Sequence, residues 1–500
     1  MTGDPLRVRL TSGEVRGIRS GGVRLWRGIP FAAPPVGALR FRGPRPVKAW
    51  RGIRVMEEFG PIAPQDRAGP FAGAAPAVER SEDCLTVNVA APARNLTSLP
   101  VMVFIHGGAY SVGAPSGVPG RGENFVRRGV VHVTFTYRLN AFGYVDLSDY
   151  GFDSNLGLRD QVAALEWVRD NIAAFGGDPA NVTVYGESSG GNAVTTLLAT
   201  PAAAGLFARA IAQSPPAAAV YPAETTARWA AEFMRILGIT PDTAPATAAQ
   251  ALLAAPADDL VRAARLLFAR VPDTDPGTQA FCPVVDGEYL PRLPLDAFRD
   301  GLTHPVPLLI GTNDREGSIF TGRRTILATT PRRMRGLLQS RPADVAARVL
   351  AEYGYPSRRG ALDFGGDFAF WIPTLHAADG HSRVAPTHLY RLDAAPRLLR
   401  VLGLDATHGL DLLTVFGRTR TTVGRLLGLL GGGAALLGVS KRMQDHWYRF
   451  AVDGTVDPAW PAWTPQTREC LVFGGAIRGA DRIEADPRAS RRKAWTAAGF

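Results

Sequence analysis

The sequence predicts an α/β fold in which helices cover both faces of a mostly parallel central sheet. From residue 100 onward, short apolar runs typical of buried strands alternate with longer segments whose apolar residues recur every three or four positions. Glycine-rich turns separate several of these segments. This alternation is typical of parallel sheets, because successive parallel strands need a crossover connection that a helix usually provides.

The first strand and helix segments lie between residues 101 and 200. We expect strands at residues 101–105, 130–137 and 181–185, where β-branched and aromatic residues are common. Helical spacing of apolar residues over 158–175 predicts a helix, which a Gly-Gly-Asp-Pro sequence then ends. A further helix is expected to begin at Gly190.

The remaining chain predicts further strands and several helical insertions. Residues 224–270 are rich in alanine and leucine and predict helices, with a break near residues 240–247. We expect one domain over residues 1–500, with helical cap insertions near two stretches of the chain, residues 220–300 and 320–385. We expect later strands at residues 306–311, 387–392 and 470–473, and a helix at residues 444–452.

Residues 426–440 form a run of leucine, glycine and alanine that resembles no other part of the chain. The central Gly431-Gly432-Gly433 weakens it as a continuous helix, so we expect a helical hairpin that is buried or docked on a surface. Ordinary packing or a dimer contact explains this run better than a membrane does. It is also shorter than the roughly 18 apolar residues of a membrane span, and we expect no membrane association.

Composition limits the classes of protein to which the chain can belong. It has 500 residues, of which 46% are hydrophobic and 20% charged, as in globular enzymes and unlike disordered chains. The net charge of +11 comes from basic residues scattered along the chain without a nucleic-acid-binding motif, so we expect no nucleic-acid partner.

Three cysteines, Cys84, Cys282 and Cys470, form no CxxC pair and no Cys/His cluster. We therefore expect free thiols, no metal site and no other cofactor. The first nine residues lack the apolar segment of a secretory signal. These observations predict a cytoplasmic protein.

Gly186-Glu187-Ser188-Ser189-Gly190 carries the strongest functional signal in the sequence. It lies between a predicted strand and a predicted helix, the context in which Gly-x-Ser-x-Gly forms the nucleophile elbow of α/β-hydrolases. The sharp turn exposes the Ser188 hydroxyl, and the helix that follows directs its first amide groups toward a developing oxyanion. A tight structural turn is the alternative interpretation.

A serine nucleophile needs a general base, which is most often histidine. In the α/β-hydrolase order of serine, acid and histidine, His106 and His132 are excluded because they precede Ser188. Of the remaining six, His408 lies in a polar, glycine-containing loop after a predicted strand, whereas the other five fit structural positions better. Asp314 and Glu316 both follow another predicted strand, and spacing alone does not choose between them as the acid.

Donors for the tetrahedral oxyanion are expected at two places. His106-Gly107-Gly108-Ala109 follows the first predicted strand, and its glycine turn can direct backbone amides at the reacting carbonyl. The partner amide is expected from Ser189, next to the nucleophile.

The chain resembles the type-B carboxylesterase family, and its para-nitrobenzyl esterase-like branch in particular, over nearly its whole length. The motifs that carry the resemblance are Gly28 to Gly37, Ser81-Glu82-Asp83-Cys84-Leu85 and Phe175 to Gly190. The resemblance implies a serine carboxylic-ester hydrolase with an α/β-hydrolase fold. It implies hydrolysis of a small-molecule ester through an acyl-enzyme intermediate. We expect small to medium, lipophilic esters, because the apolar run at residues 426–440 is a candidate lining of the active-site gorge.

The resemblance also implies a role for each site residue. It assigns the nucleophile to Ser188, the acid to Glu316 and the base to His408. It assigns the oxyanion amides to Gly108, Ala109 and Ser189, and it places Gly107 and Glu187 in the lining of the site.

Several positions depart from the family pattern. Ala63 stands where secreted members have the partner of the first cysteine, which favours a bacterial-type cytoplasmic enzyme. No tryptophan lies between Trp50 and Trp167, so choline esters are not the expected substrates. Pro215 and Asp411 replace the expected glycine and glutamate, and we expect these changes to alter the immediate surroundings of the triad but not the triad itself.

Two alternatives to an esterase are considered. A non-catalytic, neuroligin-like binding protein is disfavoured because such members usually lose a triad residue, whereas all three are present here. A lipase, lactonase or amide hydrolase would use the same triad on another substrate. A monomer and a homodimer are both compatible with the sequence.

Overall fold

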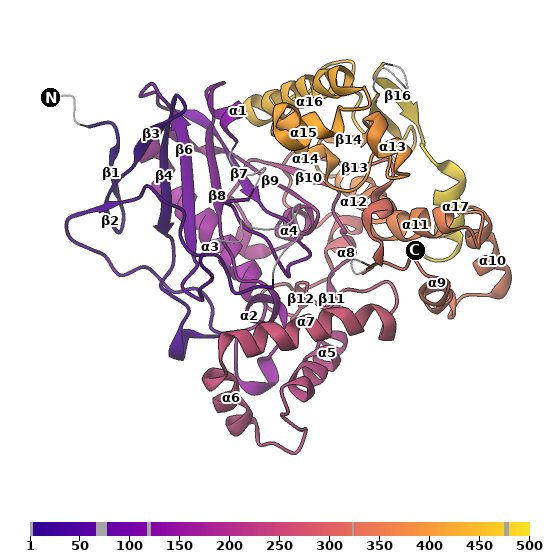
Figure 1. The fold of residues 1–500 in the computed structure, drawn as a ribbon, viewed down its shortest axis with the longest axis horizontal. Coiled ribbons are helices and arrows are strands. Elements are labelled where there is room, and N and C mark those ends of the chain that lie inside the picture. The colour runs from indigo at the N-terminus through magenta and orange to yellow at the C-terminus, as the bar shows by residue number, and fades with distance from the viewer. Residues whose placement is uncertain (1–3, 67–77, 118–121, 323–324, 475–479) are drawn as a thin grey trace.

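A large twisted sheet runs through the molecule and organises the other elements around it (Figure 1). The computed structural model describes residues 4–66, 78–117, 122–322, 325–474 and 480–500. Within these ranges the sheet has eleven strands. In spatial order they are β16 (Arg482–Ala485), β15 (Glu469–Phe473), β14 (Thr387–Leu392), β13 (Leu308–Asn313), β10 (Arg209–Gln213), β9 (Gly177–Glu187), β7 (Leu99–Ile105), β8 (Val131–Phe135), β6 (Thr86–Pro92), β4 (Val23–Pro30) and β3 (Ile18–Ser20).

The middle of this sheet is parallel and its two edges are antiparallel. Every neighbouring pair from β8 to β15 is parallel, whereas β6, β4 and β3 at one edge and β16 at the other pair antiparallel. The carboxyl ends of the parallel strands therefore lie at one edge of the sheet, where loops can bring distant side chains together.

Strand β7 shows why the sheet is covered on both faces. Its residues Val101, Val103 and Ile105 are buried in one hydrophobic cluster, and the alternate residues Met102 and Phe104 are buried in another. Successive side chains of a strand point to opposite faces, so each cluster belongs to one face of the sheet. A run that is apolar at every position is typical of such doubly covered parallel strands.

Two helical layers supply these clusters. Helices α3 (Leu156–Asn171), α4 (Ser189–Leu198), α8 (Pro294–Arg299) and α12 (Ile372–His381) pack together on one face. Helices α1 (Glu123–Val126), α14 (Leu410–Val415) and α16 (Gly433–Asp453) pack on the other. Helix α2 (Asn140–Tyr144) packs against α3. Helix α15 (Thr422–Leu427) packs against α16, and α13 (Arg397–Val401) packs against α15, in the upper part of the view (Figure 1).

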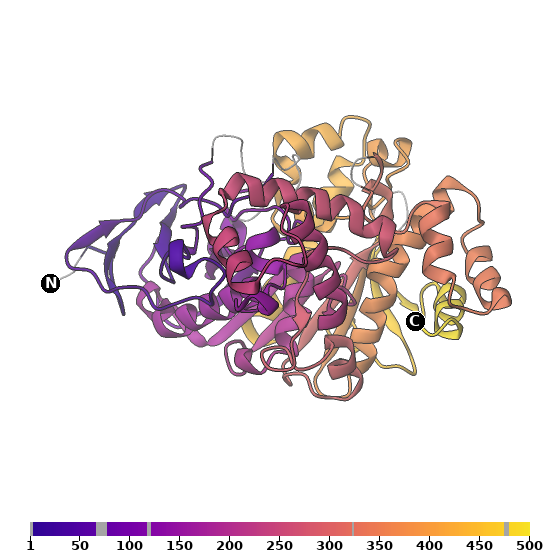
Figure 2. The same cartoon turned by 90° about the horizontal axis from the view of Figure 1, so that it is seen from below.

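Two groups of helices lie outside these layers, as both views show (Figures 1 and 2). The first comprises α5 (Ala223–Ile236), α6 (Pro245–Ala254) and α7 (Ala257–Thr274). The second comprises α9 (Pro331–Leu338), α10 (Ala343–Ala351), α11 (Arg358–Gly366) and the C-terminal α17 (Ala489–Ala497). Small sheets complete the fold: β1 (Arg7–Leu10), β2 (Gly13–Arg16) and β5 (Ile53–Val55), and the pair β11 (Tyr221–Pro222) and β12 (Val284–Val285).

The strands and helices expected from the sequence are confirmed, and their bounds differ most at two places. Strand β9 begins at Gly177, so the Gly-Asp-Pro sequence that ends the preceding helix already belongs to the next strand. Helix α16 begins at Gly433 and is much longer than residues 444–452, because Gly433 enters the helix after a turn at Gly431 and Gly432. The N-terminal strands and β10 were not anticipated; their short segments carry little periodic signal.

Candidate active site

Ser188 lies at the turn between β9 and α4. Its backbone angles, φ 61° and ψ −127°, fall in a region that residues other than glycine rarely adopt. Close packing explains the small residues on either side, since a Cβ on Gly190 would lie 2.1 Å from the Ile105 oxygen. One on Gly186 would lie 2.4 Å from the Gly190 oxygen. The strained turn and the glycines are those of a nucleophile elbow.

His408 and Glu316 come together although 92 residues separate them. The Nδ1 atom of His408 lies 2.5 Å from Oε2 of Glu316. Because an ionised carboxylate can only accept, Nδ1 carries the proton, and Nε2 of the neutral ring is left as the basic nitrogen. This tautomer is the one that can take a proton from a serine hydroxyl.

Ser214 and Asn313 hold the Glu316 carboxylate in place. The Ser214 hydroxyl donates to Oε1 of Glu316 at 2.7 Å, and the backbone amide of Asn313 donates to the same oxygen at 2.5 Å. The sequence carries no local signal for this role of Ser214. Its contact with Glu316 depends on β10 and β13 pairing side by side, which no local pattern reveals.

A second carboxylate, Glu187, lies on the other side of the His408 ring. Its Oε1 is 3.2 Å from Nε2 of His408, and the side chain is almost completely buried. Burial, opposed in part by the positive charge of His408, raises the pKa of Glu187 to about 8. Burial alone would lower the pKa of His408, but Glu187 and Glu316 outweigh it and raise that pKa to about 9.

Asp411, which replaces the glutamate expected in the family, is fully buried behind the triad. Its carboxylate accepts hydrogen bonds from Gln213 at 2.8 Å, Tyr390 at 2.9 Å and Asn313 at 3.3 Å. Burial raises the pKa of Asp411 above its usual value, although these hydrogen-bond donors oppose part of the shift. The shorter side chain therefore still has a set of hydrogen-bond donors around its carboxylate.

The expected oxyanion donors lie around the same turn. Gly108 and Ala109 have φ 123° and 54°, so the loop after β7 curls back toward the elbow, and a Cβ on Gly107 would lie 3.0 Å from Cβ of Ser188. The Tyr110 amide donates to the Ser189 hydroxyl at 3.2 Å, which ties this loop to α4. Within the described ranges, the amides of Gly108, Ala109 and Ser189 donate to no other backbone group outside helices and strands.

The link between Ser188 and His408 is the one triad contact that the structure does not form. The Nε2 atom of His408 is buried and has no hydrogen-bond partner among the described residues. Catalytic hydrogen bonds are often long without substrate and tighten in the complex. The pairing of these two residues stays a prediction.

Two aromatic rings pack against His408. The centroid of Phe370 lies 4.6 Å from that of the imidazole, and the centroid of Phe320 lies 5.3 Å from it. Phe370 belongs to a π-helical turn, Asp367–Trp371, between α11 and α12. Such turns often occur at functional sites, but the sequence carries no signal for this one.

The other acid and base candidates lie in different surroundings. Asp314 pairs with Arg488 at 2.8 Å rather than with His408. His304 contacts the backbone oxygen of Thr200, and His381 contacts that of Val306. These two histidines satisfy backbone groups, as expected for structural positions.

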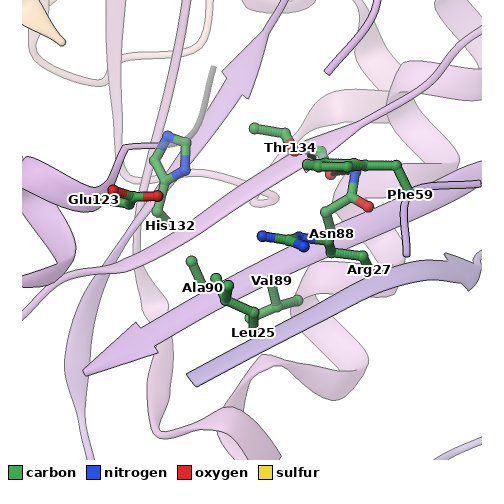
Figure 3. A pocket seen from close by; sticks show the side chains of 9 residues that line it. All are labelled: Leu25, Arg27, Phe59, Asn88, Val89, Ala90, Glu123, His132 and Thr134. Atoms are coloured by element: carbon green, nitrogen blue, oxygen red, sulfur yellow. Dashed lines mark hydrogen bonds between the residues drawn. The ribbon is translucent and has the colours of Figure 1, made fainter. Parts of the chain in front are cut away.

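A pocket on the antiparallel side of the sheet is separate from this site (Figure 3). It lies over β4, β6 and β8, and none of the predicted site residues lines it. Its lining residues are Leu25, Arg27, Phe59, Asn88, Val89, Ala90, Glu123, His132 and Thr134. His132 is engaged with the Tyr185 hydroxyl at 2.7 Å, and burial lowers its pKa to about 3.

Neither a metal-binding cluster nor a membrane-spanning helix occurs among the described residues. In the part of the chain that the structure describes, no three His, Cys, Asp or Glu side chains are grouped to hold a metal ion. Among the described helices, none has the length and apolar character needed to cross a bilayer. The three cysteines are free and buried.

Comparison with known proteins gives concordant matches along the whole chain. The model of the carboxylesterase family matches residues 4–488. The chain is 37% identical to para-nitrobenzyl esterase of Bacillus subtilis, over 96% of each protein. It is 34% identical to fumonisin B1 esterase of Sphingopyxis macrogoltabida, over 97% of this chain and 90% of that protein. A solved structure of a PNB esterase matches with a TM-score of 0.84 at 35% identity, covering 98% of this chain and 100% of the other.

Proposed function

The chain belongs to the carboxylesterase family and is a serine carboxylic-ester hydrolase with an α/β-hydrolase fold, and from this premise we propose that Ser188, His408 and Glu316 are its catalytic triad. The observation that carries the proposal is the 2.5 Å contact between His408 Nδ1 and Glu316 Oε2. This contact leaves Nε2 unprotonated in the neutral ring and free to accept a proton.

In the acylation step, Ser188 Oγ attacks the ester carbonyl carbon while His408 Nε2 takes the hydroxyl proton. The carbonyl oxygen becomes an oxyanion, which the amides of Gly108, Ala109 and Ser189 stabilise. The carbon–oxygen bond to the alcohol then breaks, and His408 returns the proton to the leaving oxygen. An acyl group remains on Ser188.

Deacylation repeats the same chemistry with water. His408 accepts a proton from water as the water oxygen attacks the acyl carbon, and the same amides stabilise the second oxyanion. Collapse of this intermediate breaks the bond to Ser188 Oγ, which recovers its proton from His408. The products are a carboxylic acid and the free enzyme.

The preferred substrates are proposed to be small to medium, lipophilic esters. Phe320 and Phe370 present apolar rings beside His408, where part of the substrate must lie during proton transfer. Apolar groups gain free energy when they leave water for such a wall. A series of para-nitrophenyl esters of increasing chain length measures this preference.

The triad is tested by replacing its nucleophile. Ser188→Ala is expected to lower turnover of para-nitrophenyl acetate by at least about 10⁴-fold, because the remaining groups cannot form an acyl-enzyme. It should also prevent labelling by a fluorophosphonate probe. Ser148→Ala, at an exposed serine, is the matched control and should keep both properties.

Labelling of Ser188→Ala at the wild-type rate would contradict the assignment of the nucleophile. An unlabelled wild-type chain would contradict the triad itself. Circular dichroism of both variants separates these outcomes from loss of the fold.

Two further features are part of the proposal. One α/β-hydrolase domain spans residues 1–500, with caps near residues 220–300 and 320–385; the two outlying helical groups support these bounds. The enzyme is proposed to work in a reducing bacterial cytoplasm. Three free, buried cysteines support this compartment.

A further inference from the structure

Several exposed apolar residues belong to α13, to α15 and to the segment that leads into and begins α16, helices that lie in the upper part of Figure 1. Leu429, Val401 and Leu402, which are 70%, 68% and 61% exposed, are the three most exposed large hydrophobic residues in the described ranges. Helix α13 packs against α15, and α15 packs against α16, so these side chains share one region. We call this region the leucine surface; its members are Val401, Leu402, Leu426, Leu429, Leu430 and Leu437.

The tip of the hairpin between α15 and α16 presents two of these leucines. Gly431 and Gly432 have φ 96° and 86°, and they reverse the chain immediately after Leu429 and Leu430. No heavy atom lies within 4 Å of the position that a Cβ on Gly431 would occupy, so the tip stands in open space. Clustered apolar side chains that remain this exposed among the described residues mark an interaction surface.

Positive charge predominates around the leucine surface, and the exposed acidic residue nearest to it along the chain, Asp445, is paired with Arg128. Residues 395–444 contain seven arginine and lysine residues and two acidic residues, Asp405 and Asp411. Both aspartates are buried, so they add no negative charge to the outer face. Arg397 and Lys441 are exposed four residues from Val401 and Leu437, on the same sides of α13 and α16. Arg425 directly precedes Leu426 and is also exposed.

These cations are available to an outside partner. Within the described ranges, Arg397, Arg425 and Lys441 form no salt bridge, whereas Arg442 is paired with Asp481. A second copy of the chain docked through this surface would bring like charges together, because the exposed Asp445 near Lys441 is already paired with Arg128 and the three cations face no other exposed carboxylate in residues 395–445. A partner that offers an apolar interior beneath a layer of negative charge matches both features.

We propose that the leucine surface docks on the surface of an anionic lipid bilayer. Leu429 and Leu430 enter the boundary between headgroups and acyl chains, and Arg397, Arg425 and Lys441 contact lipid phosphates. Peripheral attachment of this kind needs no membrane-spanning helix. It revises the expectation of no membrane association, which assumed that residues 426–440 pack against protein.

Flotation of the full chain with phospholipid vesicles tests the proposal without using its enzymatic activity. Wild-type protein is expected to float with vesicles of phosphatidylcholine and phosphatidylglycerol in equal parts. Binding to phosphatidylcholine alone should be at least about tenfold weaker, because each basic residue near the surface adds attraction only when the lipid is anionic. Raising the salt concentration should weaken the anionic binding.

Paired variants assign the binding to the leucine surface. Leu429→Ser with Leu430→Ser is expected to lower the partition coefficient by about tenfold or more. The matched control, Leu253→Ser with Leu266→Ser, changes two exposed leucines elsewhere and should bind as wild type. Arg425→Gln with Lys441→Gln should weaken anionic binding several-fold, whereas Lys48→Gln with Arg51→Gln, which removes the same charge, should not.

Hydrolysis of a water-soluble ester and thermal unfolding show that each variant is folded. The proposal is overturned if wild-type protein does not float with anionic vesicles. Equal effects of the two leucine pairs, or equal binding to both kinds of vesicle, would also overturn it. A combined result would also overturn it. In that case vesicle binding is absent, and sedimentation velocity shows a dimer that Leu429→Ser with Leu430→Ser abolishes.

Discussion

His408 is held between two carboxylates, and this arrangement defines when it can act as a base. Glu316 contacts Nδ1 at 2.5 Å and Glu187 lies 3.2 Å from Nε2. Both carboxylates stabilise the imidazolium that forms when His408 takes a proton from Ser188. They also favour the protonated ring before the reaction. The same carboxylates that stabilise the transition state therefore raise the pH above which His408 is neutral and can act as a base.

The pH dependence of hydrolysis should reveal the second carboxylate. The pKa of His408 is raised to about 9, and the base works only when deprotonated, so kcat/KM should rise with pH until the ring is neutral. Glu187→Gln removes one negative charge near the ring, which lowers this pKa and moves the rising limb to lower pH. At a pH above the limb, kcat should fall on the order of tenfold, because the imidazolium loses stabilisation.

A matched carboxylate variant separates this local effect from a change of net charge. Glu166→Gln removes an exposed carboxylate of α3 and should leave the pH profile as in wild type. A rising limb that stays in place in Glu187→Gln would show that Glu187 does not act on His408.

At the scale of elements, the elbow depends on how closely β9, α4 and the end of β7 approach one another. Gly190 packs against the Ile105 backbone, and Gly191 approaches the Gln213 oxygen, where a Cβ would lie 2.6 Å away. These contacts leave no room for side chains. They also hold Ser188 in its strained conformation, because the neighbouring backbone cannot relax around it.

Gly190→Ala should therefore destabilise the protein far more than an ordinary helical substitution. A Cβ 2.1 Å from the Ile105 oxygen forces backbone movement, with an expected cost of at least about 2 kcal/mol in the free energy of unfolding. Gly438→Ala is the control, since its Cβ would meet only the flexible end of Arg442 at 3.4 Å.

Urea unfolding followed by circular dichroism measures both variants. Gly438→Ala lies inside α16 and should be neutral or slightly stabilising, because alanine is the better helix former. Equal stability of Gly190→Ala and wild type would contradict this prediction, because it would mean that the backbone around the elbow can move to accommodate the added Cβ.

At the scale of the whole molecule, the C-terminal segment fastens the second helical group to the active-site edge of the sheet. Arg488 pairs with Asp314, two residues before Glu316, and with Asp367 at the start of the π-helical turn. In α17, Trp495 is fully buried, lies 5.0 Å from the Phe364 ring and donates to the Tyr353 hydroxyl at 2.7 Å. The C-terminal segment thus supports both the loop that carries Glu316 and the turn that carries Phe370.

Trp495→Ala should cost about 3–5 kcal/mol of unfolding free energy, as for other large buried aromatic residues. Calorimetry should show a clearly lower melting temperature. Lys493→Ala, at an exposed position of the same helix, should leave the melting temperature close to that of wild type. A Trp495→Ala protein with wild-type stability would show that α17 does not contribute to the folded core.

The sequence alone determined the features that depend on neighbours along the chain. The elbow motif, the alternating strands and helices, and the glycine turn after β7 are local patterns of size, polarity and backbone freedom. They predicted the fold class and the candidate nucleophile, and the family resemblance added the candidate acid and base. The first outlying helical group was also foreseeable, because residues 224–270 have a helical composition.

Only the tertiary structure decided which distant groups meet. Asp314 and Glu316 are equivalent in spacing, yet Asp314 meets Arg488 and Glu316 meets His408. The Ser214 contact with Glu316 depends on the register of β10 and β13, and Phe370 reaches His408 through a turn without a sequence signal. The exposure of Leu429 and Leu430 likewise depends on what packs around the hairpin. Contacts of this kind depend on the whole packed chain, and local sequence does not encode them separately.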